Sequence, residues 1–121
     1  MATFPHRKEP CAECPWRKDV PVGKFRPERF RALAPTAYDM HRMIFACHMS
    51  KDEKPFACAG FLLQAAAHNL TVRMVIARDA YGNDVAAGGY PLFATYREMA
   101  IANGVAPDDP ALKRCRDDGQ L

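Results

Sequence analysis

Four cysteines in the first half of the chain have the type and spacing of metal ligands. Cys11 and Cys14 are separated by two residues in CAECPWRK, and Cys47 and Cys58 follow after a gap of 32 residues, with ten residues between them. Zn²⁺ takes four nitrogen or sulfur ligands, and a C-x2-C turn points two thiolates at one ion. Cys58 also opens a predicted helix, whose free amides favour a thiolate. The pattern therefore predicts one structural Zn²⁺ site made by these four cysteines.

Several alternatives to this site remain open from the sequence. His48 is adjacent to Cys47, so either of them is the fourth ligand while the other packs or hydrogen-bonds beside the site. Four thiolates also hold a [4Fe–4S] cluster, and Cys14–Pro15 is typical of ferredoxin cysteine runs, although those runs are tighter. The cysteines can instead be inert core residues. A thioredoxin-like dithiol is disfavoured, because the surrounding prolines do not fit a strand before the pair and a helix after it.

Trp16, Arg17 and Lys18 follow the C-x2-C turn directly, and Trp16 is the only tryptophan in the chain. A rigid aromatic ring beside cations is typical of nucleobase stacking or of a protein-interface anchor. Alternatively, the ring covers the metal site as a hydrophobic lid. We expect the ring to pack on the cysteine site while Arg17 and Lys18 stay exposed at a partner surface.

A polar pair on a predicted long helix, residues 59–78, forms a second candidate site. The apolar line of this helix, at 3.6-residue spacing, consists of Leu63, Ala67, Leu70, Met74 and Ala77. Asn69 and Arg73 fall on a second side of the helix, between other apolar residues, where an unpaired buried charge costs several kcal/mol. The pair either ties down loop carbonyls near the metal lobe or lines a substrate-binding cleft beside the metal, together with His48 or Glu98.

The remaining pattern predicts a mainly α, small single domain of about four helices, with a loop-rich N-terminal lobe stapled by the metal site. Residues 1–26 form an irregular basic arm, because prolines and glycines interrupt them too often for a helix. Helices are expected over residues 27–34, 37–43, 59–78 and 91–103, the last with Leu92, Tyr96 and Met99 inward and Gly104 as its stop. Residues 105–121 form a loosely ordered tail, in which Cys115 is a free thiol.

Charge and composition limit the classes of function. Residues 1–60 carry 11 Lys and Arg against 7 Asp and Glu, whereas residues 61–121 carry 6 against 7. The basic half is the half with the cysteine motif, which suits a polyanionic partner. No apolar run reaches the ~18 residues of a membrane helix, and the N-terminus lacks an apolar segment, so a cytoplasmic chain without membrane contact is expected. In that compartment cysteines favour metal over disulfides.

Several segments resemble a family of small uncharacterised cysteine-motif proteins that is associated with bacteriophages and actinobacterial genomes. They are CAECPWRKD, FACH followed by CAGFLLQ, HNLTVR, and YREMAIANGVAPDDPALKRC near the C-terminus. The resemblance runs from about Pro10 to Cys115. It implies no known activity, but it does imply that the four cysteines and His48 belong to one site and that the protein has a viral accessory role.

Three hypotheses of function follow. The first is a zinc-stapled accessory protein that binds a host macromolecule, either a protein or a nucleic acid. The second is an iron–sulfur protein with a redox or sensing role. The third is a small enzyme with a cleft around Arg73 and Asn69. A closed site of four cysteines, and the lack of a recognisable nucleophile and base in one motif, favour a binding protein over an enzyme.

Overall fold

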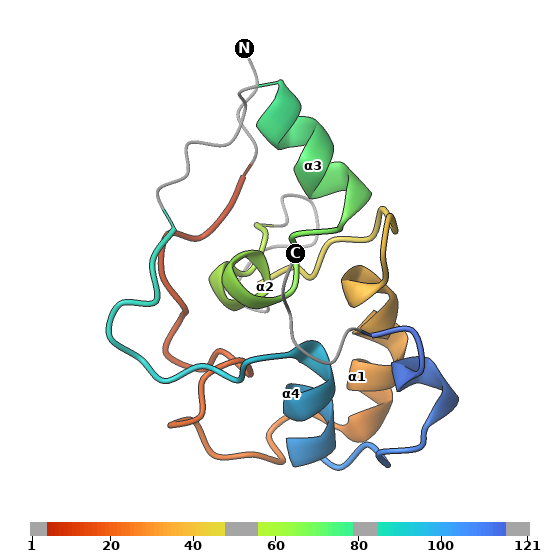
Figure 1. Ribbon diagram of the computed structural model, residues 1–121. Coiled ribbons are helices and arrows are strands. Elements are labelled where there is room, and N and C mark those ends of the chain that lie inside the picture. The colour runs from red at the N-terminus through yellow and green to blue at the C-terminus, as the bar shows by residue number, and fades with distance from the viewer. Residues whose placement is uncertain (1–4, 48–55, 79–84, 116–121) are drawn as a thin grey trace.

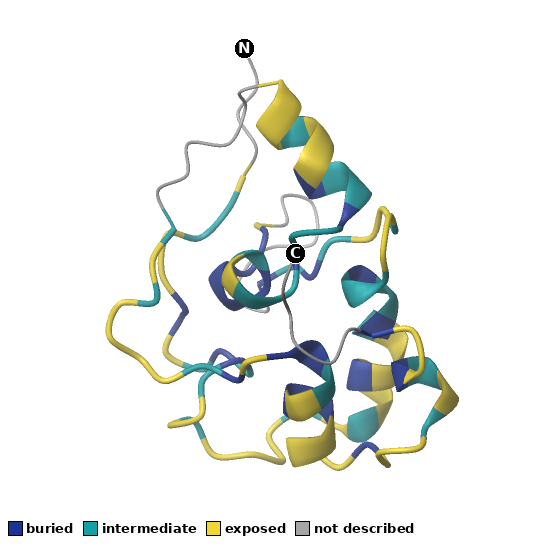
Figure 2. Ribbon diagram, viewed as in Figure 1, coloured by how far each residue is buried: buried dark blue, intermediate teal, exposed yellow. Residues whose placement is uncertain are grey.

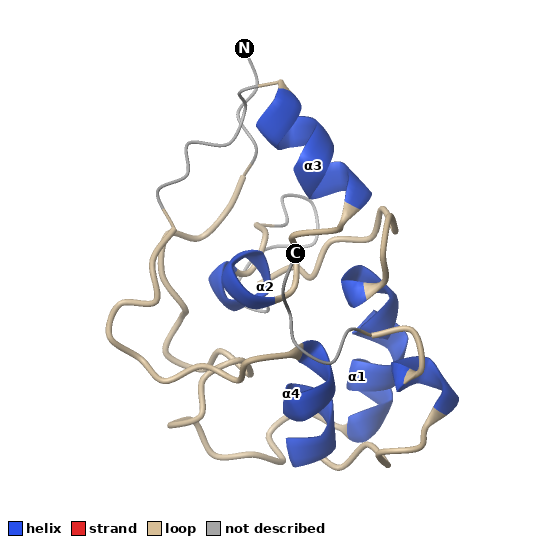
Figure 3. Ribbon diagram, in the orientation of Figure 1, coloured by secondary structure: helices blue, strands red, loops and turns tan. Residues whose placement is uncertain are grey.

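In the part of the chain that this computed structural model describes, the fold consists of four short α-helices joined by long extended segments (Figures 1 and 3). The elements are α1 (Pro27–Leu33), the 3-10 turn η1 (Ala34–Ala37), α2 (Ala59–Gln64), α3 (Leu70–Ala77), α4 (Tyr96–Ala102) and the 3-10 turn η2 (Pro110–Leu112). The structure describes residues 5–47, 56–78 and 85–115. Within these ranges the chain has isolated β-bridges but no strand. The prediction of a mainly α chain of about four helices is confirmed.

Helix α1 begins where its proline predicts. Pro27 is in the first turn, where its fixed φ suits the helix and its missing N–H is not needed. The helix tightens into η1 at the next proline, Pro35. Phe30 is the buried residue of α1 and lies at the centre of the apolar core.

The second helix, predicted over residues 37–43, is not formed. Thr36 donates its hydroxyl to the Leu33 carbonyl (2.7 Å) instead of capping a new helix. Met40 has a left-handed backbone (φ 59°), which a right-handed helix does not contain. Its amide donates to the His68 carbonyl (2.7 Å), so this segment is held by a distant part of the chain rather than by local helical bonds.

The single helix predicted over residues 59–78 is broken into α2 and α3. Ala65 leaves the helical conformation (φ −140°, ψ 2°), and Asn69 begins α3 as its N-cap. The Asn69 Oδ1 accepts a hydrogen bond from the Val72 amide (3.2 Å). An asparagine side chain competes with the helical backbone in this way, and therefore favours a helix start over a helix interior.

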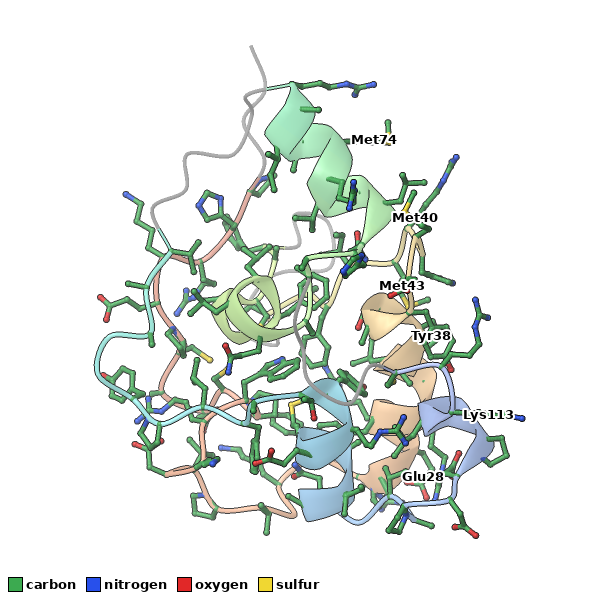
Figure 4. The ribbon with its side chains drawn as sticks, viewed as in Figure 1. Glu28, Tyr38, Met40, Met43, Met74 and Lys113 are labelled. Carbon is green, nitrogen blue, oxygen red and sulfur yellow. The ribbon has the colours of Figure 1, made fainter. Side chains whose placement is uncertain are left out.

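This break turns the predicted apolar line of the long helix towards solvent. Leu63 is 37% exposed and Met74 is 40% exposed. Figure 2 shows α3 exposed along much of its length, and Figure 4 shows Met74 pointing away from the fold. The prediction that this line faces the core was wrong. It placed the residues around the axis of one continuous helix, whereas the chain forms two separate helices here.

Asn69 is 1% exposed and connects three segments of the chain. The side chain caps α3 through Oδ1, and its Nδ2 donates to the carbonyls of Thr36 (3.2 Å) and Met43 (2.7 Å).

We expect Asn69→Ala to lower the free energy of unfolding by about 2–4 kcal/mol, because the cap is lost and two carbonyls lose their donor. Urea denaturation measures this. Arg73→Ala, one turn along α3 and exposed, is the control and should change stability by less than about 0.5 kcal/mol; equal losses for both variants would contradict the assignment.

Helix α4 begins at Tyr96 rather than at Pro91. Thr95 is its N-cap, and the Thr95 Oγ1 accepts a hydrogen bond from the amide three residues later (3.0 Å). Tyr96 and Met99 are buried, as predicted. Gly104 has φ 102° and ends the helix, also as predicted, because glycine adopts this conformation without steric cost.

The segment after α4 packs against α1 and η1 up to Cys115. Leu112 is fully buried, and the Tyr38 hydroxyl donates to the Ala111 carbonyl (2.6 Å). The expectation of a loosely ordered tail was therefore wrong for residues 105–115, because this segment supplies apolar residues to the core. The rest of the predicted tail lies outside the described residues.

The N-terminal arm runs beside the segment that leads into α4 (Figure 1). The Lys18 amide donates to the Pro91 carbonyl (2.8 Å), and the Phe93 amide donates to the Trp16 carbonyl (2.9 Å). The largest fully buried side chains all belong to one apolar cluster, to which the arm contributes Trp16. They are Trp16, Tyr96, Phe30, Phe61 and Met99. Among the described helices, none has the length and hydrophobicity that a membrane span requires.

Candidate metal centre

Cys11 and Cys14 lie at the two ends of a tight turn in the arm. The Cys14 amide donates to the Cys11 carbonyl (3.2 Å), and the Arg17 amide donates to the Cys14 carbonyl (3.1 Å). Cys11 is 7% exposed and Cys14 is fully buried. The turn therefore keeps both side chains out of solvent, in an arm that also contains exposed residues.

Cys47 and Cys58 come from two short segments that pair with each other. Their backbones are joined by the bonds from the Cys47 amide to the Phe56 carbonyl (2.7 Å) and from the Cys58 amide to the Phe45 carbonyl (2.9 Å). These bonds flank an antiparallel bridge, so the two cysteines fall on the same face of the pair, in diagonal positions. Both are buried. Cys58 is also the residue that precedes α2.

All four cysteines line one cavity beneath the arm. Its volume is about 10 Å³, which is close to the least that a single water molecule requires. The apolar residues around it include Phe30, Leu33 and Phe45. Residues that are far apart in the sequence thus converge on a space of about one atom, lined mainly by apolar residues.

The sulfur atoms are arranged as two pairs. The Sγ atoms of Cys14 and Cys58 are 3.7 Å apart, far beyond the ~2.05 Å of a disulfide, and all five cysteines are free thiols. Cys11 forms a hydrogen bond with Cys47. In a tetrahedral site with zinc–sulfur bonds of about 2.3 Å, two sulfurs are separated by about 3.8 Å. Within the described residues, no three His, Cys, Asp or Glu side chains already form a group that could hold an ion.

The Cys14–Cys58 contact divides the ionisation of the pair unequally. The hydrogen bond with Cys58 lowers the pKa of Cys14 to about 7, against the opposing effect of burial. The same bond raises the pKa of Cys58, and burial raises it further. Burial also raises the pKa of Cys11 to about 11. Without an ion, therefore, this contact favours the thiolate at Cys14 over the thiolate at Cys58.

Backbone amides near the cysteines favour the thiolate form. The amide two residues after a cysteine lowers the pKa of that thiol in three cases, namely Glu13 for Cys11, Trp16 for Cys14 and Gly60 for Cys58. For Cys58 the backbone amides of Phe61 and Gly60, at the start of α2, lower the pKa, against the larger effects of the Cys14 hydrogen bond and of burial, which raise it. Amides directed at sulfur in this manner stabilise thiolate ligands of metals.

Trp16 is fully buried and packs within the aromatic core. Its ring meets Tyr96 (centroids 5.8 Å apart) and Phe45 (6.1 Å) edge-on. Gly60 allows this packing, since a Cβ at that position would lie 2.5 Å from the Trp16 Cγ. The alternative of Trp16 as an exposed anchor was wrong, because stacking on a partner needs an accessible face. The ring belongs instead to the buried cluster that contains the four cysteines.

Arg17 is held in place by the arm itself rather than presented to solvent. Its guanidinium donates to both carboxylate oxygens of Asp19 (2.8 and 2.7 Å) and to the Cys11 carbonyl (3.1 Å), and it lies 3.7 Å over the Tyr90 ring. Its side chain is 12% exposed. The expectation of an exposed Arg17 was wrong, whereas Lys18 is exposed, with its Nζ 3.5 Å from the Glu98 carboxylate.

Arg17→Lys tests whether this guanidinium fixes the C-x2-C turn. Lysine keeps the charge but lacks the planar fork that binds Asp19 at two points and the Cys11 carbonyl at a third. We expect the melting temperature of the zinc-loaded protein to fall by several degrees, measured by circular dichroism. Lys18→Arg, on the next residue, serves as the control and should leave the melting temperature unchanged. An unchanged melting temperature for Arg17→Lys would show that the turn does not depend on the fork.

The other predicted site residues are not gathered at this centre. Asn69 is buried and committed to hydrogen bonds, whereas Arg73 is exposed on α3, so the two do not share a buried cleft. His48 lies outside the described residues. Cys115 is buried, with its Sγ 3.9 Å from the Ala34 carbonyl, and is not among the residues that line the cysteine cavity.

Two residues at this centre were not identified from the sequence. Arg7 and Arg29 line the same cavity as the cysteines. Nothing in the spacing of these arginines relative to the cysteines predicts the arrangement, because they reach the cavity from the arm and from α1.

Comparison with known proteins agrees with the extent of the resemblance seen in the sequence. No curated protein matches the chain, and no solved structure does. A family model described as a family of unknown function, DUF6283, matches residues 6–116, which covers both halves of the cysteine motif and all four α-helices. Since this match spans most of the 121 residues, the chain belongs to the DUF6283 family.

Proposed function

We propose that this protein binds one structural Zn²⁺ through Cys11, Cys14, Cys47 and Cys58, and that it acts by binding a macromolecule. The observation that carries the metal site is the convergence of four buried thiols on one small cavity, with two sulfurs 3.7 Å apart. That separation matches the edge of a zinc–thiolate tetrahedron. Completing the site requires the Cys11–Cys47 pair to turn towards the Cys14–Cys58 pair across the cavity that they share.

The surroundings of the cavity fit a tetrathiolate ion. Backbone amides near Cys11, Cys14 and Cys58 favour the thiolate form of these ligands. The apolar lining keeps water away, and four protein ligands leave no position open for substrate, which is typical of structural rather than catalytic zinc. The proposal assigns the fourth ligand to Cys47 rather than to His48.

A metal at this position joins three segments that are otherwise held by a few backbone hydrogen bonds and by the packing of Trp16 against Phe45 and Gly60. The arm, the segment before residue 48 and the start of α2 each provide at least one cysteine. Structural zinc contributes about 10–16 kcal/mol in small sites, comparable to the whole stability of a domain. The ion would therefore replace the sheet or long helix that a loop-rich lobe lacks.

Elemental analysis of protein purified without oxygen and without added metal tests the identity of the ion. We expect one zinc per chain and a colourless solution. A brown protein with iron and matching sulfide would contradict the zinc proposal and favour a [4Fe–4S] cluster. The cavity favours zinc, because a volume of about 10 Å³ suits one ion, whereas the eight atoms of a cluster require the surrounding core to expand.

Binding of a macromolecule is supported by charge and by the nature of the centre. Residues 1–60 carry the net positive charge of the chain, and they contain the arm. The metal centre is closed, and the predicted cleft around Asn69 and Arg73 is not formed, so neither offers a place for a small substrate. The surface of the arm is where a polyanionic partner would be attracted.

A further inference from the structure

An open groove runs along the N-terminal arm, on the outer side of the metal centre. It is lined by residues 6–12 together with Phe56 and Tyr90, and its volume is about 510 Å³. The arm is fixed on both sides, since the Arg7 amide donates to the Ala57 carbonyl (3.0 Å) and the Ala86 amide donates to the Lys8 carbonyl (2.9 Å). Figure 1 shows the arm and the segment after residue 84 side by side. A groove of this size holds a ligand of one or two nucleotides.

Two large aromatic rings line this groove and are accessible to solvent. Phe56 is 41% exposed and Tyr90 is 37% exposed. The Tyr90 ring is fixed, because the Arg17 guanidinium covers it from 3.7 Å and Gly88 packs so closely that a Cβ would lie 3.3 Å from the ring. The ring is therefore held in a defined position in the lining of the groove, and its exposed part is available for stacking.

The polar lining of the groove is predominantly cationic. Arg7 and Lys8 line it together with His6, and the one acid among the lining residues is Glu9. The Glu9 carboxylate lies against Gly88, in the space that a side chain there would occupy. A lining that combines cations with accessible aromatic rings suits a ligand that presents both phosphates and flat bases. An acidic protein segment would use the charges but not the faces of the rings.

We propose that this groove binds single-stranded nucleic acid, with phosphates at Arg7 and Lys8 and bases stacked on Phe56 and Tyr90. This deepens the proposed function and rests on it, because the metal at Cys11 fixes the inner end of the groove. Duplexes are excluded by the same chemistry, since their bases are stacked on each other and do not offer their faces to a protein.

Fluorescence anisotropy of zinc-loaded protein with labelled ten-nucleotide oligo(dT) and oligo(U) tests the proposal, with the two strands distinguishing DNA from RNA. We expect binding to at least one of them that weakens steeply with salt, and weaker binding to a duplex of equal length. Phe56→Ala and Tyr90→Leu should each weaken binding about fivefold or more. Lys8→Glu should weaken it and reduce the slope of log K against log salt by about one or more.

Matched controls use residues outside the groove. Lys113→Glu makes the same charge change at a residue, labelled in Figure 4, that does not line the groove, and Met74→Ala removes an exposed apolar side chain. Neither should change binding by more than about twofold. If protein that holds one zinc per chain binds neither strand, the proposal for the groove is overturned, whereas the proposal for the metal site stands. Equal binding of duplex, equal competition by polyglutamate, or equal effects of Lys8→Glu and Lys113→Glu would overturn it as well.

Discussion

Cys14→Ser and Cys58→Ser are expected to yield protein that is unfolded or insoluble. Each change removes one of the two sulfurs that stand 3.7 Å apart and, with it, a ligand of the proposed ion. Loss of a structural zinc site removes about 10–16 kcal/mol of binding free energy. This is as large as the whole free energy of unfolding of an ordinary domain, about 5–15 kcal/mol. Circular dichroism and zinc content of the soluble fraction measure both consequences.

Cys115→Ser is the matched control for these variants. Cys115 is 4% exposed and Cys58 is 3% exposed, so the same substitution is made at equally buried thiols, only one of which lines the cavity. The carbonyls of Ala34 and Ala111 lie near the Cys115 Sγ (3.9 and 4.0 Å) and can accept the new hydroxyl. We expect this variant to fold and retain zinc, with a loss of about 1 kcal/mol. Equal melting temperatures for Cys58→Ser and the parent would contradict a metal-dependent fold.

Gly60→Ala is expected to destabilise the protein although it lies in a helix. An exposed glycine in a helix interior gains about 1 kcal/mol on replacement by alanine, so helix propensity alone predicts stabilisation. Here the new Cβ would lie 2.5 Å from the Trp16 Cγ, and Trp16 is fully buried. Overpacking of this kind costs about 1–3 kcal/mol or more. Because α2 starts directly after Cys58, displacement of the helix should also weaken zinc binding, as measured by competition with a chromophoric chelator.

Gly23→Ala separates packing from backbone effects in this comparison. Gly23 has φ 91°, and a Cβ at that position would meet no other atom within 4 Å, so its substitution costs only the left-handed backbone strain. We expect this variant to lose some stability while its zinc affinity is unchanged. A stabilised Gly60→Ala protein would mean that Trp16 does not pack against α2 as described.

Local signals were sufficient for several elements of the fold. Pro27 marks the start of α1, and Gly104 marks the end of α4, because both residues restrict or permit backbone angles on their own. Tyr96 and Met99 were placed in the core from their spacing on a short helix. The cysteine spacing likewise selected four thiols that the fold brings to one cavity.

Other features depend on long-range contacts that the local pattern does not contain. The break between α2 and α3 is stabilised by Asn69, whose amide reaches carbonyls 33 and 26 residues away. An exposed anchor at Trp16 stayed open as an alternative because its neighbours in sequence are polar, yet its neighbours in space are Phe45 and Tyr96. Arg17 likewise packs over the ring of Tyr90. That ring comes from a segment that no local sequence pattern places beside the arm.

X-ray absorption spectroscopy at the zinc edge tests the metal centre most directly. The spectrum reports the type, number and distance of the atoms bound to the ion, independently of any effect of mutation on folding. We expect four sulfur ligands at about 2.3 Å, from Cys11, Cys14, Cys47 and Cys58. A shell in which nitrogen or oxygen replaces one or more of the sulfurs, or a folded protein that binds no zinc, would contradict the four-cysteine site.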